Sequence, residues 1–475
     1  EKEGILMDKN NGAIYDARKL GKPKMIILGV QHMFAMFGAT ILVPILTGLD
    51  ISTTLLMAGL GTLLFHCITK FKVPAFLGSS FAFLGGYAAI KAFSPNDPNS
   101  MLPYACLGVA CAGLIYFILA AVIKAVGIEK VMRFFPPVVT GPIIIAIGLG
   151  LAPSAVSNCT TNWFLAVVAL AVIVVFNIWG KGMAKIIPII LGLLISYGTG
   201  LVLYFISQAN PDLIQNVPWL FSGGADANGV YQPIFDFTSL NTICDNISKG
   251  HIFGSEGLIG IPIHWDKTVF GGIDYSNGAL IASSIIAIVP IAFATMMEHI
   301  GDICAISSTT GNNYIKDPGL HRTLVGDGLA TTLASLFGGP ANTTYGENTG
   351  VLALTRVYDP RVIRIAAYFA VAVSFFPIVS VIIGSIPSCI IGGISFVLYG
   401  MISAIGVRNV VENKVDFTKS RNLIVAAVIL VCALGLSSDT VSFTIGSAAI
   451  TLSPLAVASI AGIVLNAVFP GKDYK

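Results

Sequence analysis

The chain has 475 residues, of which 55% are hydrophobic and only 11% are charged, and its mean hydropathy is +0.84. Soluble domains carry about 25% charged residues, so this composition excludes a soluble protein and predicts one embedded in a membrane. The net charge of +3 is small, and nucleic acid is not expected as a partner.

The N-terminal stretch 1–24 is polar and mixed in charge, so we expect a cytoplasmic tail rather than a signal peptide. Fourteen apolar segments follow, and several match the length that crosses about 30 Å of hydrocarbon. A polar, acidic loop at 207–278 separates seven segments in 25–206 from seven in 279–470, and 471–475 form a short tail. The expected segments are 25–47, 52–69, 74–86, 102–123, 138–152, 163–180, 186–206, 279–300, 324–338, 341–355, 362–384, 388–405, 422–436 and 442–469.

The placement of basic residues supports this count and predicts the orientation. If both termini are cytoplasmic, 24 of the 27 Lys and Arg residues fall on the cytoplasmic side. Only Lys91, Lys249 and Lys267 fall on the other side. Because cytoplasmic loops carry the excess of basic residues, we expect a multi-pass protein of the inner or plasma membrane with an external 207–278 loop.

Two short matches predict that the halves are duplicated. Gln31-His32 matches Glu298-His299 at an offset of 267, and Pro74-Ala75 matches Pro340-Ala341 at an offset of 266. Seven segments in each half require the two copies to have inverted topology. Segments three and ten, which contain the second match, are both interrupted by Pro, Gly and hydroxyl residues. We therefore predict an all-α polytopic membrane protein of two inverted repeats, with extended stretches before half helices in segments three and ten.

A few acidic residues lie within the expected segments and predict the site. Glu298 and Asp302 are four residues apart, so they share one face of a helix, and Glu347 opens the half helix of segment ten. Such residues are costly in a membrane and usually functional. We expect Asp327, which lies near a segment end, to be structural, as we do Arg356.

The pattern of donors and acceptors narrows the ligand. Because no basic residue lies near Glu298 and Glu347 in the expected segments, these two carboxylates would bind a cation or a neutral ligand with N–H donors rather than an anion. The half helices that begin after Ser80 and Gly346 offer backbone N–H groups to carbonyl oxygens. A planar imide such as a nucleobase would satisfy both. A metal ion is disfavoured because no clustered third or fourth acid lies beside them.

Several stretches of the chain resemble the nucleobase/ascorbate transporter family. They are Gln31 to Thr40, Gly78 to Phe81, Glu298 to Asp302, Asp317 to Arg322 and Thr343 to Tyr358. Within that family, Glu-Asn-Thr-Gly at 347–350 followed by Thr-Arg-Val-Tyr at 355–358 resembles bacterial uracil/proton symporters, whereas purine members usually carry Gln at the position of Glu347. The match covers nearly the whole chain outside 207–278. That loop is larger than is usual in the family, and the sequence assigns it no role.

The resemblance implies a core of segments one to four (25–124) and eight to eleven (279–384), and a gate of segments five to seven (136–206) and twelve to fourteen (388–469). It implies that uracil enters with protons as the core moves against the gate, and that the protein forms a homodimer through the gate. No cofactor is expected, since the proton gradient would supply the energy.

The resemblance also implies roles for individual residues. Substrate contacts are expected from the side chains of Glu298 and Glu347, the backbone N–H groups of Phe81 and Gly346, the stretch at Ser80, and the rings of Phe81, Tyr345 and Tyr399. Proton coupling is expected from Asp302, which replaces a second His of the best-known uracil member, with Glu298 as a rival. His299 has two open interpretations, direct coupling or a bond to a backbone carbonyl. Gln31, His32 and Asn348 are expected to support the site.

Three alternatives stay open from the sequence. A purine permease for xanthine or uric acid would share the fold, and an anion channel or passive anion carrier would share the inverted architecture. A membrane enzyme is disfavoured because no nucleophile with a base and no metal motif stands out. Separately, Cys159 and Cys244 both fall in expected external stretches and could pair.

Overall fold

The computed structural model describes residues 13–127, 130–131, 133, 136–436, 442–445 and 448–471. Residues 1–12 and 472–475, which make up much of the two predicted tails, lie outside the described residues. The backbone of Glu347 belongs to a described helix, but its side chain is outside the description.

The described chain is mostly helical, in agreement with the predicted class. The first half contains α1 (Lys22–Thr47), α2 (Ile51–Ile68), α3 (Leu84–Lys91), α4 (Leu102–Val126), α6 (Pro137–Cys159), α7 (Trp163–Trp179), α8 (Met183–Ile186) and α9 (Pro188–Ala209). The loop contains α10 (Asp212–Asn216), α11 (Pro218–Phe221), α12 (Thr238–Ser248) and α13 (Val269–Gly272). The second half contains α14 (Gly278–Ile288), α15 (Ile291–Thr310), α16 (Leu320–Leu336), α17 (Gly346–Thr355), α18 (Pro360–Ser374), α19 (Pro377–Gly384), α20 (Ser388–Glu412), α21 (Ser420–Gly435) and α22 (Pro454–Val468).

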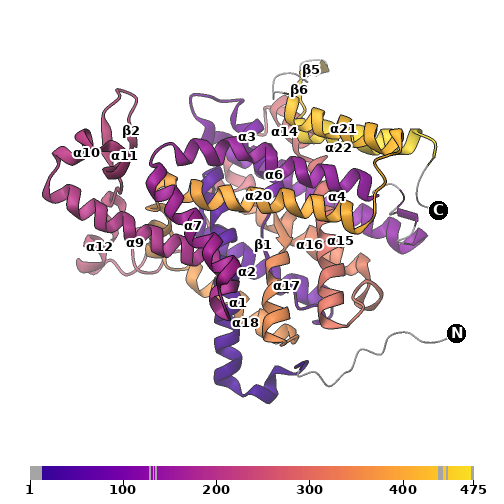
Figure 1. The fold of residues 1–475 in the computed structure, drawn as a ribbon, viewed down its shortest axis with the longest axis horizontal. Helices are drawn as coiled ribbons and strands as arrows, with labels where there is room; N and C mark the ends of the chain where they lie inside the picture. Colours follow the sequence, from indigo (N-terminus) through magenta and orange to yellow (C-terminus); the bar gives the residue numbers. More distant parts are fainter. Residues whose placement is uncertain are drawn as a thin grey trace.

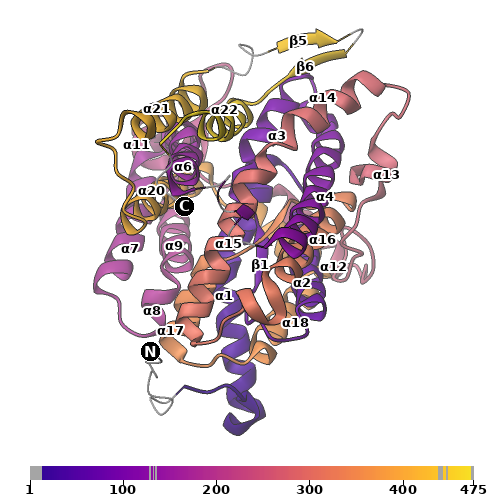
Figure 2. The same ribbon diagram turned by 90° about the vertical axis from the view of Figure 1, so that its right-hand side faces the viewer.

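Within the described parts of the chain there are also three pairs of short strands, and all three are antiparallel. They are β1 (Leu77–Ser79) with β4 (Asn342–Thr344), β2 (Ser222–Ala225) with β3 (Tyr231–Pro233), and β5 (Ser442–Ile445) with β6 (Ala448–Thr451). The first pair joins the two halves of the chain, since its strands precede α3 and α17. β1 lies near the middle of the molecule in both views (Figures 1 and 2).

Local sequence signals explain where several helices begin and end. The side chains of Asp50 and Asn162 accept hydrogen bonds from the backbone at the starts of α2 and α7, and Asp359 does so at the start of α18. Such caps satisfy N–H groups that have no partner within the helix. Gly48 and Gly311 follow α1 and α15 in the left-handed region, where glycine is favoured.

Among the described residues, seven helices are long and apolar enough to cross a membrane, and an eighth span is formed if α18 and α19 count as one broken helix. These two are bent by 88° at Phe375 and Phe376. α7, α21, α22 and the α3 region are shorter apolar helices. The count of fourteen segments therefore stays a prediction.

The two halves pack in a repeated pattern. α4 lies against α16 as α18 lies against α2, and α7 with α9 has its counterpart in α21 with α22. α6 lies along α20 across the middle of the view in Figure 1. Close approach requires glycine: a Cβ on Gly113 of α4 would lie 2.7 Å from the Gly328 carbonyl oxygen of α16. This pattern is expected of two structural repeats.

Two segment predictions need correction. The expected helix at 442–469 begins only at Pro454, because 442–445 and 448–451 form the paired strands β5 and β6. β5 and β6 consist largely of Thr, Ile and Phe, which favour strands over helix. The expected continuous segment at 362–384 is broken before Pro377, since a proline within a helix removes a backbone hydrogen bond.

The suggested disulfide is also absent: Cys159 and Cys244 are both free, with Cys159 buried at the end of α6 and Cys244 exposed on α12.

Candidate functional site

The candidate site is built where the two broken elements meet. β1 and β4 pair with Gly78 opposite Thr343. The backbone N–H of Ser80 donates to the Ala341 oxygen at 2.8 Å, and that of Tyr345 donates to the Phe76 oxygen at 3.2 Å. These bonds bring together the starts of the two half helices. At about 1.5 Å per residue, the ten residues of α17 span about half of the hydrocarbon.

Polar side chains of α2 hold the extended stretch before α3. The hydroxyl of Thr62 lies 3.2 Å from the Leu77 oxygen and accepts from the Leu77 N–H at 2.9 Å. Nε2 of His66 lies 2.9 Å from the Ala75 oxygen. A carbonyl can only accept, so the His66 proton is on Nε2. The strand is thereby fixed without a wider sheet.

Asn348 ties α17 to α1 and to the same stretch. Its amide nitrogen donates to the Pro74 oxygen at 2.9 Å, and its amide oxygen lies 2.8 Å from Nδ1 of His32. Because the Pro74 carbonyl can only accept, the amide orientation is determined and His32 must carry its proton on Nδ1. Both side chains are fully buried. Gln31 precedes His32 on α1 and is partly buried.

Tyr345, which directly follows β4, stabilises the pairing of β1 with β4. Its hydroxyl donates to the Ser79 oxygen at 2.9 Å and lies 3.4 Å from the hydroxyl of Thr40. A Cβ on Gly78 would lie 2.5 Å from the Tyr345 ring, so only glycine permits this contact. Tyr345 is 5% exposed. The Tyr345 ring therefore packs against the β1–β4 pair and stabilises it, and this role does not depend on contact with a ligand.

Phe81, which follows β1, contacts the predicted gate. Its ring lies edge-on to the ring of Tyr399 of α20, with 6.4 Å between centroids. Phe81 is partly buried, whereas Tyr399 and Ser80 are each 1% exposed. Tyr399 of α20 therefore lies against Phe81, and its contact with a ligand stays a prediction.

One acidic residue of α15, Asp302, lies beside the start of α17, and Glu298 lies one helical turn before it. Glu298 is exposed and Asp302 is partly buried. A Cβ placed on Gly346, which is itself exposed, would lie 3.3 Å from an Asp302 carboxylate oxygen. A carboxylate facing lipid would cost several kcal/mol, so the exposure of Glu298 indicates a surface open to water or a ligand. Glu347 follows Gly346 in the first turn of α17.

A chain of side chains leads from Asp302 into the protein. The hydroxyl of Thr344 donates to the Asp302 carboxylate at 3.0 Å and lies 3.2 Å from Nδ1 of His299. The same nitrogen lies 3.5 Å from the carboxylate of Asp327. Because hydroxyl and imidazole groups can each pass a proton, this arrangement connects a partly exposed acid to a buried one.

Asp327 was expected to be structural and to lie near a segment end, and that position is wrong. The residue is fully buried within α16, as is His299 on α15. A contact between these helices cannot be read from the spacing in the chain. The signal available was the charge of Asp327 within an apolar segment, which usually marks function. For His299, the contacts found are with side chains rather than a backbone carbonyl.

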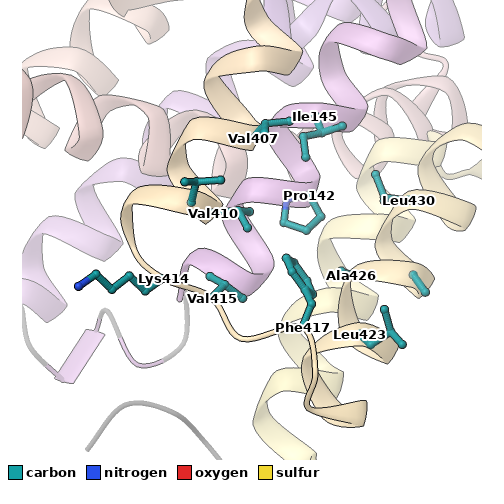
Figure 3. A pocket seen from close by; sticks show the side chains of 12 residues that line it. Pro142, Ile145, Val407, Val410, Lys414, Val415, Phe417, Leu423, Ala426 and Leu430 are labelled. Carbon is teal, nitrogen blue, oxygen red and sulfur yellow. The ribbon is translucent and has the colours of Figure 1, made fainter.

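A separate groove of about 630 Å³ lies between α6, α20 and α21. Figure 3 shows its lining, which includes Pro142, Val410 and Phe417 and is apolar apart from Lys414. It contains none of the predicted site residues. Its side chains offer no acceptor for ligand N–H groups, so this groove does not match a ligand that carries both N–H and carbonyl groups.

Known proteins resemble the chain along almost its whole length. A family model described as "Permease family" matches residues 23–442. The uracil permease of Bacillus caldolyticus is 38% identical over 94% of this chain and 92% of its own. The uracil permease of Bacillus subtilis (strain 168) is 37% identical over the same shares. A putative pyrimidine permease, RutG of Escherichia coli (strain K12), is 34% identical over 97% of this chain and 93% of its own.

Solved structures support the fold. The transmembrane domain of a cyanobacterial bicarbonate transporter, BicA, superimposes with a TM-score of 0.56 over 95% of this chain and 99% of its own, at 13% identity. The structure of SLC26A9 gives a TM-score of 0.52 over 96% of this chain and 66% of its own, at 10% identity. The sequence matches, which span nearly the full length, show that the chain belongs to the nucleobase/ascorbate transporter family of membrane permeases.

Proposed function

We propose that the chain imports uracil together with protons across the cytoplasmic membrane. The observation that carries this proposal is the position of Gly346, the exposed first residue of α17, beside the Asp302 carboxylate and on the side of α15 that carries Glu298. A helix start supplies donors and the acids supply acceptors, so a neutral ring with both carbonyl and N–H groups is matched. Relatives named uracil permeases support the choice of uracil.

In this mechanism, Glu298 and Glu347 accept from the two N–H groups of the pyrimidine. The backbone N–H groups of Phe81 and Gly346 donate to its carbonyl oxygens. Phe81 of the core and Tyr399 of the gate enclose the uracil ring between them, since their own rings are in edge contact. A substrate held at the boundary of the two domains is released when the core moves against the gate.

The proton pathway is assigned to Asp302, Thr344, His299 and Asp327. Asp302 takes the proton at the open side, because it is the partly exposed member of the chain. Thr344 and His299 then pass it inward over contacts of 3.0 and 3.2 Å. Asp327, whose carboxyl oxygen lies 3.5 Å from the same nitrogen of His299, is the buried end of this path and receives the proton.

The test is uptake of radiolabelled uracil by proteoliposomes with and without an inward proton gradient. We expect accumulation only with the gradient, and equal uptake after its collapse would contradict symport. Unlabelled xanthine, uric acid and uracil are then compared as competitors. Stronger displacement by xanthine or uric acid would replace uracil by a purine as the substrate.

An Asp302→Asn variant separates binding from coupling. Because asparagine keeps the acceptor oxygen for Thr344 but cannot take the proton, uracil should still bind while accumulation against a gradient is lost. Normal concentrative uptake by this variant would assign coupling to Glu298 instead.

Orientation and assembly follow the same proposal. Both termini are assigned to the cytoplasm, because the basic residues gather on that side. A homodimer through the gate is assigned from the family resemblance. Labelling Lys249 from outside intact cells with a membrane-impermeant amine reagent would test the first, and chemical crosslinking in native membranes would test the second.

A further inference from the structure

The 207–278 loop, to which the sequence assigned no role, is built in two arms that rest on different domains. We call residues 211–237 the gate arm, because they contact the predicted gate helices α7 and α9, and residues 252–275 the core arm, because they contact the predicted core. α12 (Thr238–Ser248) connects the arms. In Figure 2, α11 lies on the side of α7, whereas α12 and α13 lie on the opposite side of the view, and α13 packs against α4 and α16.

The gate arm is fixed to α7 by one buried amide. Asn162, which is 1% exposed, donates to the oxygens of Ser222 at 2.8 Å and Leu220 at 3.3 Å. Its own oxygen accepts from the Leu165 N–H at the start of α7. One side chain therefore both caps the gate helix and holds the arm.

Aromatic rings fix the end of the gate arm to α9. Phe235 and Phe237 stack with their centroids 5.2 Å apart. Tyr204 of α9 lies edge-on to both, at 5.9 and 5.5 Å, and Tyr197 lies 4.8 Å from Phe235. Such pairs add to the apolar burial and prefer defined geometry. The last residue of the gate arm is thus held on a gate helix.

The core arm is fixed to three places in the core. The hydroxyl of Thr53 on α2 donates to the Pro262 oxygen at 2.6 Å, and the Gly260 N–H donates to the Phe375 oxygen at 2.9 Å, at the end of α18. The Asp274 N–H donates to the hydroxyl of Tyr104 on α4 at 3.0 Å.

Charges reinforce the core arm at the start of α2. His264 and Lys267 lie 3.6 and 3.9 Å from the carboxylate of Asp50, which caps α2. These charged groups are partly exposed, so the hydrogen bonds and the packing stabilise the core arm more than the ion pairs do.

The connection between the arms has little slack. Phe237, on the gate aromatic cluster, is followed directly by Thr238, the first residue of α12. The Asp236 carboxylate accepts from both the N–H and the hydroxyl of Thr238, at 2.9 and 2.6 Å, which orders this turn. α12 then packs against α19, the helix that leads from the predicted core to α20 of the predicted gate. Two chain crossings between the domains are therefore packed together.

We infer that residues 211–275 form a strap that restrains the movement of the core against the gate. This inference rests on the proposed function, because it is the transport cycle that requires such movement. When the core shifts, the turn at Phe237 and Thr238 must bend, or one arm must leave its domain. Either event breaks ordered contacts, so the strap raises the barrier between the end states and limits their separation.

The test adds slack at the crossing. A flexible linker of twelve Gly and Ser residues, with a root-mean-square span of about 17–21 Å, is inserted between Phe237 and Thr238. The matched control carries the same linker between Asn228 and Gly229, in the exposed β2–β3 turn. That turn lies within the gate arm, so the control adds the same length without freeing the crossing.

Two readouts are measured on the full-length protein. The first is uracil exchange in proteoliposomes, for which we expect turnover to rise at least about twofold in the crossing variant relative to the control, since conformational steps often limit transport cycles, while the Kd for uracil stays unchanged. The second is the distance distribution between spin labels at Thr160, directly after α6, and Ser100, before α4, with the exposed cysteines replaced by serine. This distribution should broaden only in the crossing variant.

The outcomes separate the strap from the transport proposal. If the parent protein binds no uracil, the substrate proposal fails, and the spin labels still decide the strap. If the crossing variant and its control behave alike in both readouts, the strap is refuted and the transport proposal stands.

If the crossing insertion does not fold, Thr53→Val replaces it, because this change removes the donor to Pro262 at nearly constant volume. Its control is Thr54→Val, because the Thr54 hydroxyl donates locally, to the backbone oxygen of Asp50 at the start of α2. Broadening in the first and not in the second supports the strap, and equal distributions refute it.

Discussion

Replacing Asn348 by alanine should both destabilise the protein and lower its affinity for uracil. The side chain makes hydrogen bonds of 2.8 and 2.9 Å, to His32 and to the Pro74 oxygen, in a fully buried position. Alanine leaves the Nδ1 proton of His32 and the Pro74 carbonyl without these partners. At about 1–3 kcal/mol for each buried group, the loss is about 2–6 kcal/mol of unfolding free energy.

The same change should act on the ligand through α17. Asn348 lies in the first turn of that helix, two residues after Gly346, so its loss frees the helix start from α1 and from the stretch before β1. We expect the Kd for uracil to rise about tenfold, which corresponds to about 1.4 kcal/mol. Stability is measured as the thermal unfolding midpoint in detergent, and affinity by isothermal titration with uracil.

A matched control comes from the gate. Asn422 on α21 is 1% exposed; its side chain donates to the backbone oxygen of Asp416 at 2.9 Å and accepts from Arg421 at 3.1 Å. Asn422→Ala should lower the unfolding midpoint by a similar amount and leave the Kd for uracil unchanged. The reasoning is refuted if Asn348→Ala unfolds at the parent temperature, or if both variants bind uracil as the parent does.

Three further predictions concern other parts of the molecule. Gly148→Ala should cost about 1–3 kcal/mol of stability, because its Cβ would lie 2.3 Å from a backbone oxygen of α20, whereas Gly150→Ala on the same helix meets only an ordinary contact at 3.9 Å; equal unfolding midpoints would contradict this. Glu347→Gln should weaken uracil binding by about 1–3 kcal/mol, and an unchanged Kd would remove this residue from the pocket. Hydrogen bonds from Arg18 lower the pKa of Asp16 from 3.8 to about 2, so the stability difference between the parent and Asp16→Asn should be constant above about pH 5 and shrink only as the pH falls towards 2; a change near neutral pH would contradict the assignment.

The sequence predicted the elements whose signal is local. Pro74 and Pro340 mark the interrupted stretches, and the structure places a strand after each, with a short helix following. Proline and glycine act on the residues next to them, so their effect can be read from the chain. The break between α18 and α19 was missed, because an apolar run that continues through a proline also fits one kinked helix.

The contacts of the site were less accessible, because they join helices distant in the chain. Asp327 and His299 are 28 positions apart and meet only because α15 and α16 pack together. The sequence shows that each residue is costly in a membrane, but not that one faces the other. In the same way, Asn348 could be expected to brace its half helix, but its partners on α1 and before β1 follow from tertiary packing.

The broken helices explain why the chemistry collects where it does. A continuous membrane helix uses all its interior N–H groups within itself, whereas a helix that begins midway presents free N–H groups there. Such a start must be held by other means, and here Thr62, His66, Asn348 and Tyr345 supply those bonds to the extended stretches. The polar residues around the β1–β4 pair therefore have two roles. They satisfy the backbone of two interrupted helices, and they keep the start of α17 beside Asp302 of α15. A change in Asn348 should therefore alter both the stability of the protein and its affinity for uracil.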